Sequence, residues 1–506
     1  MPGPYNRAMA TTVRQFQNFI GGEWVDAASG DTFDSTSPAD GELIGTFPKS
    51  GPDDVDRAVA AAKVAYEDWR LVPAPKRGEI LFRFAQLLVT HKDELTELMS
   101  HEMGKVKAEA GGDVQEAIDM SYYMGGEGRR LFGQTTTSEL RDKFQMSVRL
   151  PIGVVGVITP WNFPIAIPSW KIAPALVCGD TIVFKPATDT PALGHRFVEL
   201  LDEAGVPKGV VNIVHGGGGA VGDALVRHPD VPVITLTGSR ETGVEVLKTA
   251  ADRLKHVHLE LGGKDAIIVM EDADLDLAVD GILWSAFGTS GQRCTAASRV
   301  IVHESLYDRL ATRLVERAEA LTLGFGWEDS TDVGPVINRP ALEKIHSYVQ
   351  IGSEEGATLL TGGEVATEGD LARGFYYRPT IFGDVAPDMR IAQEEIFGPV
   401  LSLIRVRDED EAVRVSNGIR YGLSSSIFTQ DVNRAFRAMR DLQAGITYVN
   451  AGTIGAEVHL PFGGVKETGN GHREAGQAAL DVFTEWKSVY VDYSGHLQRA
   501  QIDNLE

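Results

Sequence analysis

The pattern of hydrophobic residues divides the chain near residue 152. Between residues 53 and 130, apolar residues recur at helical spacing, as in DDVDRAVAAAKVAYEDW, which predicts a helical layer. From residue 152 the chain shows short, β-branched apolar runs, and those from TIVFKP to HVHLEL are separated by helix-like segments. Because strands that alternate with helices form parallel sheets, this region predicts a first α/β domain.

A second alternation of strands and helices follows. It begins at AIIVM, continues through SRVIVHES and a helix near 305–320, and reaches LSLIRV and GITYVN. We therefore expect a second α/β domain, with the boundary near Gly262. Two alternating segments, residues 143–150 and 485–493, have no obvious place in either sheet and predict a projecting arm that serves oligomerisation.

Composition narrows the class of protein. The 506 residues, 43% hydrophobic and 24% charged, are typical of a globular protein with two or three domains. A net charge of −23 disfavours binding to nucleic acid or anionic membranes. No apolar run approaches the ~20 residues that span a bilayer. The two cysteines form no CxxC pair and no Cys/His cluster, so we expect a cytoplasmic protein with neither disulfide nor metal site.

Two features of the first domain are candidates for ligand binding. The strand TIVFKP ends at Lys185, just before a helix that begins near Pro191, and open α/β sheets bind ligands at this edge. The segment HGGGGAVGDAL places Gly218 and Gly222 at another helix start. These glycines either present backbone N–H groups to an anion or simply turn the chain. A P-loop motif is absent, as is a GxGxxG motif with its acidic partner.

Three side chains are candidates for chemistry, each with a plain alternative. Cys294 in TSGQRCTAAS is either core filler or a nucleophile. Glu260 closes the strand in HLELGGK, where a carboxylate is either a surface residue or a paired or working group. Asn162 in TPWNFP either forms a turn or presents an oriented amide. A thiol, a carboxylate and an amide beside a nucleotide-type α/β domain are what thioester chemistry coupled to hydride transfer requires.

The chain resembles the aldehyde dehydrogenase superfamily over nearly its whole length. The resemblance is carried by motifs in the family's order: TPWNFP, FKPA, LTGSRETG, LELGGKD, GQRC, EEIFGPV and PFGGVKETGNG. It implies an α/β fold of two parallel-sheet domains, with a Rossmann-like cofactor domain over residues 10–131 and 152–262 and a catalytic domain over residues 263–478. It also implies a β arm over residues 132–151 and 479–496 that supports homodimers or dimers of dimers, hence a homotetramer.

The resemblance also implies a mechanism. Cys294 matches the nucleophile that converts an aldehyde to a thiohemiacetal, whose oxyanion is held by the Asn162 amide and the Cys294 backbone N–H. Hydride transfer to the nicotinamide then leaves a thioacyl-enzyme, and Glu260 activates the water that hydrolyses it to a carboxylic acid. Lys171 matches a lysine close to the nicotinamide end and is expected to be catalytic. Cys178 matches no functional position.

Further positions match cofactor contacts. Lys185 and Glu395 match residues that hold the two riboses, while Gly218 and Gly222 match glycines near the adenine. The other expected contacts are Ile158, Thr159, Pro160, Trp161, Thr237, Gly238, Ser239, Leu261 and Phe397. Thr188 stands where many NAD-preferring relatives have glutamate, so we expect both NADP and NAD to be used. Asp189 beside it either restores some repulsion or faces elsewhere.

The substrate is the least determined part of the prediction. Arg293 matches an arginine that binds the distal carboxylate in the aminoadipate semialdehyde branch, and it is otherwise a salt-bridge residue. The loop NAGTIGAEVHLPFGG departs from that branch. Aromatic residues suit an apolar tunnel for ordinary aldehydes, and the expected substrate contacts are Phe163, Trp170, Arg293, Thr295 and Phe462.

We therefore expect oxidation of broad aliphatic and aromatic aldehydes, or else of a dedicated ω-carboxylated semialdehyde such as aminoadipate or succinic semialdehyde. CoA-acylating members of the family typically lack the carboxylate at the position of Glu260, which favours water as the acyl acceptor. A non-catalytic structural or binding relative is disfavoured, because such a chain would be expected to lose the thiol, the amide or the carboxylate.

Overall fold

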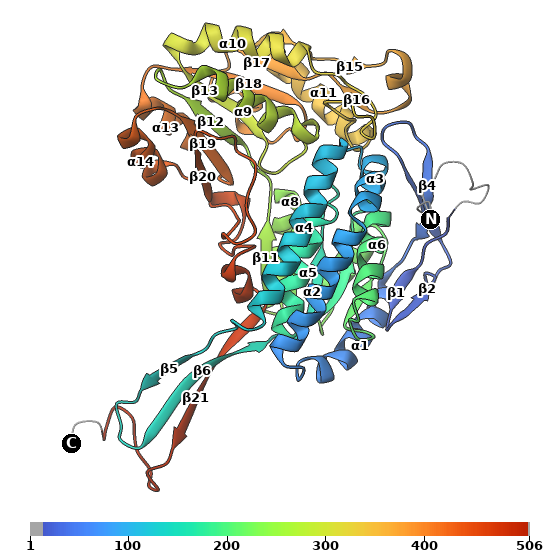
Figure 1. Cartoon of the computed structure of the whole chain (residues 1–506), viewed down its shortest axis with the longest axis vertical. Helices are drawn as coiled ribbons and strands as arrows, with labels where there is room; N and C mark the ends of the chain where they lie inside the picture. Colours follow the sequence, from blue (N-terminus) through green and yellow to red (C-terminus); the bar gives the residue numbers. More distant parts are fainter. Residues whose placement is uncertain (1–13, 504–506) are drawn as a thin grey trace.

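Two α/β units and a projecting antiparallel sheet make up the chain (Figure 1). The structure is a computed structural model that describes residues 14–503, so residues 10–13 of the predicted cofactor-binding domain lie outside it. The predicted α/β fold with two parallel-dominated sheets and a β arm is confirmed. No helix within residues 14–503 has the length and apolar character needed to cross a membrane.

The first sheet has seven strands, of which five are parallel. All five residues of β8 (Thr181–Lys185) are buried, as expected where helices cover both faces of a parallel sheet. In spatial order the strands are β11 (His256–Glu260), β10 (Val233–Thr237), β7 (Val154–Ile158), β8, β9 (Val211–Ile213), β1 (Asn18–Ile20) and β2 (Glu23–Val25). The last two are antiparallel at the sheet edge.

The helical layer predicted for residues 53–130 resolves into separate helices. The first, α1 (Pro52–Trp69), begins at a proline and has Asp53 and Asp54 in its first turn, where acidic groups complement the helix dipole. The others are α2 (Ala74–Thr90), α3 (Lys92–Glu102) and α4 (Lys107–Glu127). Helices of the α/β region follow: α5 (Ala166–Cys178), α6 (Pro191–Glu203), the π-helical turn η1 (Gly218–Gly222), α7 (Asp223–Arg227) and α8 (Arg240–Ala251).

The second sheet also has seven strands, and only β14 is antiparallel to its neighbour. Their spatial order is β14 (Thr358–Thr361), β17 (Thr380–Gly383), β18 (Val400–Val406), β13 (Ala297–His303), β12 (Asp265–Val269), β19 (Ser424–Phe428) and β20 (Ile446–Val449). The accompanying helices are α9 (Leu275–Phe287), α10 (Glu304–Glu319), α11 (Arg339–Glu354), α12 (Arg390–Gln393), α13 (Glu409–Asn417) and α14 (Val432–Asp441). The chain passes from the first sheet to the second between β11 and β12, on either side of Gly262.

The arm consists of β5 (Gln134–Thr137), β6 (Lys143–Pro151) and β21 (Thr484–Asp492). The register of β6 and β21 runs from Thr484 opposite Pro151 to Asp492 opposite Lys143, so segments far apart in sequence form one ribbon that extends away from both sheets (Figure 1). Both predicted strand segments of the arm lie within one residue of these bounds.

The sequence patterns did not reveal the short strands near the N-terminus. Strands β1 and β2 have three residues each, too few for a period of two to be visible, and Gly21 and Gly22 turn the chain between them with φ of 66° and 85°. Two further hairpins were also missed: β3 (Thr32–Thr36) with β4 (Leu43–Pro48), and β15 (Val365–Ala366) with β16 (Tyr376–Tyr377).

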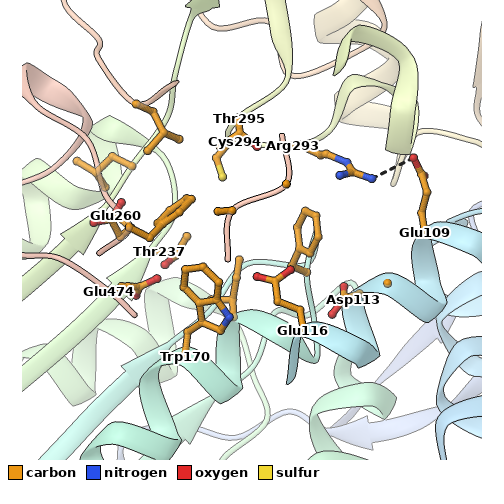
Figure 2. A pocket seen from close by; sticks show the side chains of 18 of the residues that line it. Glu109, Asp113, Glu116, Trp170, Thr237, Glu260, Arg293, Cys294, Thr295 and Glu474 are labelled. Carbon is orange, nitrogen blue, oxygen red and sulfur yellow. Dashed lines mark hydrogen bonds and ion pairs between the residues drawn. The ribbon is translucent and has the colours of Figure 1, made fainter. Parts of the chain in front are cut away.

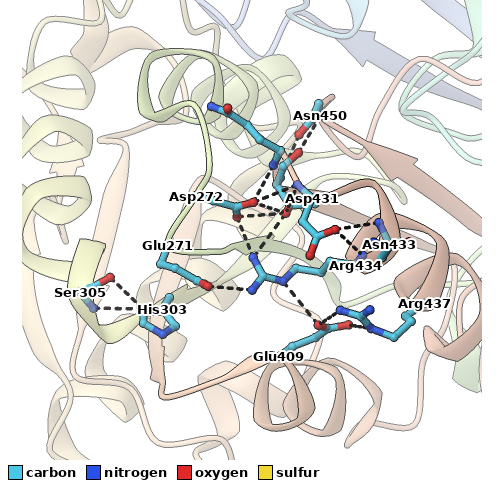
Figure 3. A network of polar contacts seen from close by, with 12 residues as sticks. Glu271, Asp272, His303, Ser305, Glu409, Asp431, Asn433, Arg434, Arg437 and Asn450 are labelled. Atoms are coloured by element: carbon cyan, nitrogen blue, oxygen red, sulfur yellow. Dashed lines mark hydrogen bonds and ion pairs between the residues drawn. The ribbon is translucent and has the colours of Figure 1, made fainter.

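A polar network fastens one end of the second sheet (Figure 3). Just after β12, Asp272 accepts hydrogen bonds from Thr429 Oγ1 at 2.8 Å and from the Asp431 backbone N–H at 2.9 Å. Arg434 on α14 donates to Asp272 and to Glu271 at 2.7 Å each. The network joins the carboxyl ends of β12 and β19 to α14, and so leaves the opposite ends of these strands for the site described next.

Candidate active site

Two cavities, of about 240 and 260 Å³, meet between the two sheets. Residues at the carboxyl ends of β10 and β11 line both of them, as does the loop that precedes β13. The side chains shared by the two cavities are Thr237, Leu261 and Cys294. Figure 2 shows the first cavity, with the Cys294 sulfur pointing into it. A substrate in one cavity and a cofactor in the other would therefore meet at this thiol.

The loop that carries Cys294 is strained and firmly held. Thr289, Ser290 and Gly291 have φ of 52°, 57° and 69° in succession, a conformation that costs non-glycine residues on the order of 1 kcal/mol or more each. Only glycine fits at 291, because a Cβ there would lie 2.3 Å from the Gly398 carbonyl oxygen. The Glu109 carboxylate on α4 accepts the Thr289 backbone N–H at 2.8 Å, and Gln292 Oε1 accepts the Ile337 N–H at 2.9 Å. These contacts fix the position of the thiol.

The environment of Cys294 keeps its sulfur protonated at rest. Burial raises the pKa of this thiol, and the carboxyl groups of Asp265 and Glu260 raise it further. The thiol is only partly exposed to solvent. A nucleophilic thiolate at this position therefore has to be generated during the reaction, by a nearby base or by a change in the surrounding charge.

Asn162 and Glu260 lie on either side of this loop. The Asn162 Nδ2 donates to the backbone carbonyl of Gln292 at 3.1 Å, which fixes the amide beside Cys294. Glu260 ends β11, is 3% exposed, and neither of its carboxylate oxygens has a hydrogen-bond partner among the described residues. Burial and the neighbouring Glu474 raise its pKa well above the usual range. The structure thus brings the thiol, the amide and the carboxylate together.

The second cavity suits the nicotinamide end of a dinucleotide. Trp161 and Phe397 meet edge to face at 5.5 Å and form an aromatic wall. Glu395 Oε1 accepts the Gly263 N–H at 3.0 Å, and a Cβ at Gly262 would lie 2.2 Å from Glu395 Oε2. The Glu395 carboxylate can accept hydrogen bonds from ribose hydroxyls, and the aromatic wall suits a flat nicotinamide ring. Of the residues predicted to bind it, those that line this cavity are Pro160, Trp161, Thr237, Gly238, Ser239, Leu261, Glu395 and Phe397.

Comparison with known proteins agrees with this geometry. The sequence pattern of the aldehyde dehydrogenase family matches residues 24–489. The chain belongs to this family. It is 41% identical to α-ketoglutaric semialdehyde dehydrogenase of Bacillus subtilis over 96% of this chain and 99% of that protein. A crystal structure of a putative aldehyde dehydrogenase from Burkholderia cenocepacia superposes with a TM-score of 0.94 at 39% identity, over 96% of this chain and 99% of that one.

Other relatives bear on the cofactor. The NADP⁺-dependent succinate-semialdehyde dehydrogenase of Escherichia coli is 39% identical over 94% of this chain and 97% of that protein. Betaine aldehyde dehydrogenase from Staphylococcus aureus, solved with NAD⁺, has a TM-score of 0.93 at 35% identity and covers 95% of each chain. The predicted enzyme class, NAD(P)-dependent oxidation of aldehydes, is confirmed at the level of the family.

The remaining cofactor candidates of this dehydrogenase lie along the same sheet edge. Ile158 ends β7, Thr159 follows it, and Lys185 ends β8. A Cβ on Gly222 would lie 3.7 Å from the Lys185 Cδ, so η1, with Gly218 at its start, borders this lysine. Burial lowers the pKa of Lys185 to about 8. These five residues do not line the second cavity, which leaves them for the more distant adenosine end.

Thr188 and its neighbour Asp189 face different surroundings. Thr188 is exposed on the turn after β8. Asp189 Oδ1 accepts a hydrogen bond from Asn338 Nδ2 at 2.8 Å, so its carboxylate is directed toward the start of α11. The Asp189 carboxylate also raises the pKa of Lys185 against the larger effect of burial, so its effect on a 2′-phosphate stays a prediction.

The first cavity holds all five predicted substrate residues: Phe163, Trp170, Arg293, Thr295 and Phe462. Trp170 and Phe462 pack edge to face at 5.0 Å. Arg293 is the only lysine or arginine that lines the cavity in the described chain. Its guanidinium donates to Glu109 at 3.0 Å and to Thr289 Oγ1 at 3.0 Å, and the side chain is 12% exposed. Arg293 thus already holds one carboxylate.

Lys171 is held in a buried ion pair. Its ammonium group is fully buried, pairs with Glu474 and donates to Thr235 Oγ1 at 3.1 Å. Lys171 itself lines neither cavity, whereas its partner Glu474 lines the first one, and the expected role of this lysine near the nicotinamide end stays a prediction. An ammonium group on buried helix α5 requires a carboxylate partner, and Glu474 supplies it from the C-terminal segment.

Several functional candidates escaped the sequence analysis. The carboxyl groups of Glu109, Asp113 and Glu116 project from one face of α4 into the first cavity (Figure 2), and their spacing of four and three residues is the only signal the sequence contained. Asp113 pairs with buried Lys105 at 2.7 Å. Within residues 14–503, no group of three or more histidine, cysteine or acidic side chains is arranged to hold a metal ion.

The two cysteines are expected to differ sharply on substitution. Cys294→Ala should abolish formation of NAD(P)H from an aldehyde, because the thiol at the meeting point of the cavities is removed. Cys178, fully buried on α5, serves as the matched control. Cys178→Ala should leave kcat within a few-fold and cost about 1 kcal/mol of stability. Steady-state kinetics and thermal unfolding of both variants check this, and turnover by Cys294→Ala would contradict it.

Proposed function

We propose that this dehydrogenase oxidises an aldehyde held in the first cavity to a carboxylic acid at Cys294. The observation that carries the proposal is that one thiol lines both cavities. When bound in the second cavity, NAD(P) would accept the hydride released as the substrate C–H bond breaks, which converts the Cys294-bound thiohemiacetal to a thioester. Glu395, Phe397 and Trp161 hold its nicotinamide riboside end, while Lys185 and the η1 glycines hold the adenosine end.

The first step needs a thiolate and an oxyanion site. The Cys294 sulfur forms a bond to the carbonyl carbon, and the carbonyl oxygen becomes an oxyanion. One Asn162 N–H holds the Gln292 carbonyl, which leaves the other N–H to donate to the oxyanion together with the Cys294 backbone N–H. A preorganised donor of this kind is worth about 3 kcal/mol to the transition state.

The second step needs a base. Glu260 accepts a proton from water, the hydroxide attacks the thioester carbon, and the carbon–sulfur bond breaks to release the acid. The base role is supported by the position of Glu260 in the wall of the first cavity and by its unbonded oxygens. A raised pKa makes Glu260 a stronger base than an exposed carboxylate.

Both nicotinamide cofactors are expected to be used efficiently. Thr188 is neutral, so the position at which many NAD-preferring relatives have glutamate places no carboxylate against a 2′-phosphate, and Asp189 is held by Asn338. Lys185 remains nearby as a cation or a hydrogen-bond donor. Like-charge repulsion at this position would otherwise amount to roughly 1–4 kcal/mol.

The substrate class follows from the first cavity. Its apolar wall of Phe163, Trp170 and Phe462 accepts aliphatic and aromatic chains. An ω-carboxylate reaches Arg293 by competing with Glu109, or by sharing the guanidinium with it. Glu116 makes no hydrogen bond or ion pair with the described residues, and burial raises its pKa to about 8. At neutral pH it is a carboxylic acid that donates a hydrogen bond to an incoming carboxylate.

The arm and the location in the cell complete the proposal. Exposed aromatic side chains on the arm include Phe144, Trp486 and Tyr490, and clustered exposed apolar surface is typical of interaction sites. The expected assembly is a homodimer or a dimer of dimers.

Two free cysteines suit a reducing compartment such as the cytoplasm.

Replacement of the base should separate the two chemical steps. Glu260→Gln is expected to give a burst of reduced cofactor close to one per active site, followed by turnover reduced about 10²-fold or more, because deacylation lacks its base. Stopped-flow absorbance of the reduced cofactor measures both phases. Loss of the burst together with turnover would show that Glu260 acts before the thioester forms.

Cofactor preference should respond to residue 188. The wild type is expected to use NADP with a kcat/KM within tenfold of that for NAD, and Thr188→Glu should shift the ratio toward NAD by about one to three powers of ten. Thr188→Gln has a similar size without the charge and is the control. A wild-type preference for NAD above a hundredfold would contradict this account of Thr188.

Substrate preference should depend on Arg293 and on pH. Arg293→Ala is expected to lower the ratio of kcat/KM for succinic semialdehyde over hexanal at least about tenfold, and Arg293→Lys less. As pH rises through about 8, Glu116 ionises and repels the carboxylate, so the same ratio should fall. Glu116→Gln should flatten this pH dependence. An unchanged ratio in Arg293→Ala would remove Arg293 from substrate recognition.

A further inference from the structure

A buried polar cluster lies next to Glu260. Lys171 on α5 pairs with Glu474 and donates to Thr235 Oγ1 on β10. Thr235 Oγ1 lies 2.9 Å from His258 Nδ1 on β11, and all of these side chains are almost completely inaccessible to solvent. The chemistry described above uses Glu260 but none of the four residues of this cluster. Burying so many polar groups together is costly.

His258 stands between two carboxyl groups. Residues 258 and 260 are two apart on one strand, so their side chains project from the same face. His258 Nε2 lies 3.7 Å from Glu260 Oε1, and Nδ1 lies 3.7 Å from Glu474 Oε1. Neither Nε2 nor the Glu260 oxygens have a hydrogen-bond partner within residues 14–503. A small rotation of the Glu260 side chain brings these unsatisfied atoms into contact and satisfies them.

The hydrogen bond at Nδ1 decides what Nε2 can offer to Glu260. A neutral imidazole has one N–H and one acceptor nitrogen. When the Thr235 hydroxyl donates to Nδ1, Nε2 carries the proton and donates to a Glu260 carboxylate. When Nδ1 carries the proton and donates to Thr235 Oγ1, Nε2 accepts from a protonated Glu260. Thr235 Oγ1 can accept from Lys171 in both arrangements, because a hydroxyl has two acceptor sites.

We infer that His258 is the positioning residue of the base: with Nδ1 accepting from the Thr235 hydroxyl, its Nε2–H donates to one Glu260 oxygen in both the charged and the neutral form of that carboxyl group. This inference rests on the proposed role of Glu260 in hydrolysis. One proton enters Glu260 from water during deacylation and later leaves it, and His258 remains neutral throughout. Glu260 thereby keeps a hydrogen-bond partner both before and after it takes up a proton.

The electrostatic surroundings of His258 fit a neutral ring. The groups that face it are Glu260 and Glu474, the cation Lys171, and His472 and Arg473 of the C-terminal segment. Burial lowers the pKa of His258 well below its usual value, and Lys171 lowers it further. The imidazole therefore holds Glu260 as a neutral hydrogen-bond donor and does not become charged.

The test compares His258→Leu and His258→Gln with the wild type by stopped-flow burst and by the pH profile of kcat. Both variants should retain a full burst. In His258→Leu, kcat should fall at least about tenfold, and its pH midpoint should rise by about one unit, because the Glu260 carboxylate loses a donor. His258→Gln keeps an N–H donor near Glu260, so it should show a smaller shift than His258→Leu. Thr235→Val should change the profile in the same direction as His258→Leu.

His472→Leu is the matched control, since the His472 ring meets the edge of His258 at 6.1 Å on an exposed segment and should leave the profile unchanged. If His258→Leu or, should that variant fail to fold, His258→Gln has the wild-type pH midpoint and kcat, the inference is wrong. Such a result beside a Glu260→Gln variant that still shows its burst would overturn the role of His258 alone. Full turnover by Glu260→Gln would instead overturn the proposed hydrolytic base.

Discussion

Burial of the titratable groups around the place where the two cavities meet governs the chemistry of this enzyme. Burial raises the pKa of the Cys294 thiol and of the Glu260, Glu116 and Glu395 carboxyl groups. Burial therefore disfavours the charged form of each of these groups. The interaction of a charge with its partner is stronger in such a buried site than in water by up to several kcal/mol. A hydrogen-bond donor or acceptor therefore has to be in place before the charge forms.

The fold supplies these partners by joining distant parts of the chain. The loop at residues 289–291 has three successive left-handed residues, a conformation that persists only when its surroundings enforce it. Glu109 on the early helix α4 provides much of that enforcement through the Thr289 backbone and side chain. The helical layer at the start of the sequence is thus a structural part of the catalytic loop, and not merely a cover for the first sheet.

Sequence reasoning reached those parts of the site that lie in continuous motifs. Cys294, Asn162 and Glu260 could be found because each is surrounded by residues that set its local backbone. Glu116, His258 and Glu474 could not, because their significance depends on which elements the sheets bring together. The ion pair of Lys171 with Glu474 could not be predicted either, because the two residues lie 303 positions apart in the sequence. The fold class was predictable because buried parallel strands produce unbroken apolar runs, whereas the three-residue strands β1 and β2 are too short to show a pattern.

Acidic residues outnumber basic ones in the lining of the first cavity, yet most of their charge is balanced or lost at neutral pH. Glu109 is paired with Arg293, Asp113 with Lys105 and Glu474 with Lys171. The two carboxyl groups without such partners, Glu116 and Glu260, are those whose pKa burial raises. Counting charged residues would therefore predict a cavity that repels anions, whereas the three ion pairs and the raised pKa of Glu116 remove most of that charge. The pairing and protonation of each lining group, and not the net charge of −23, therefore decide whether the cavity admits an anion. A carboxylated semialdehyde stays a candidate substrate for this reason.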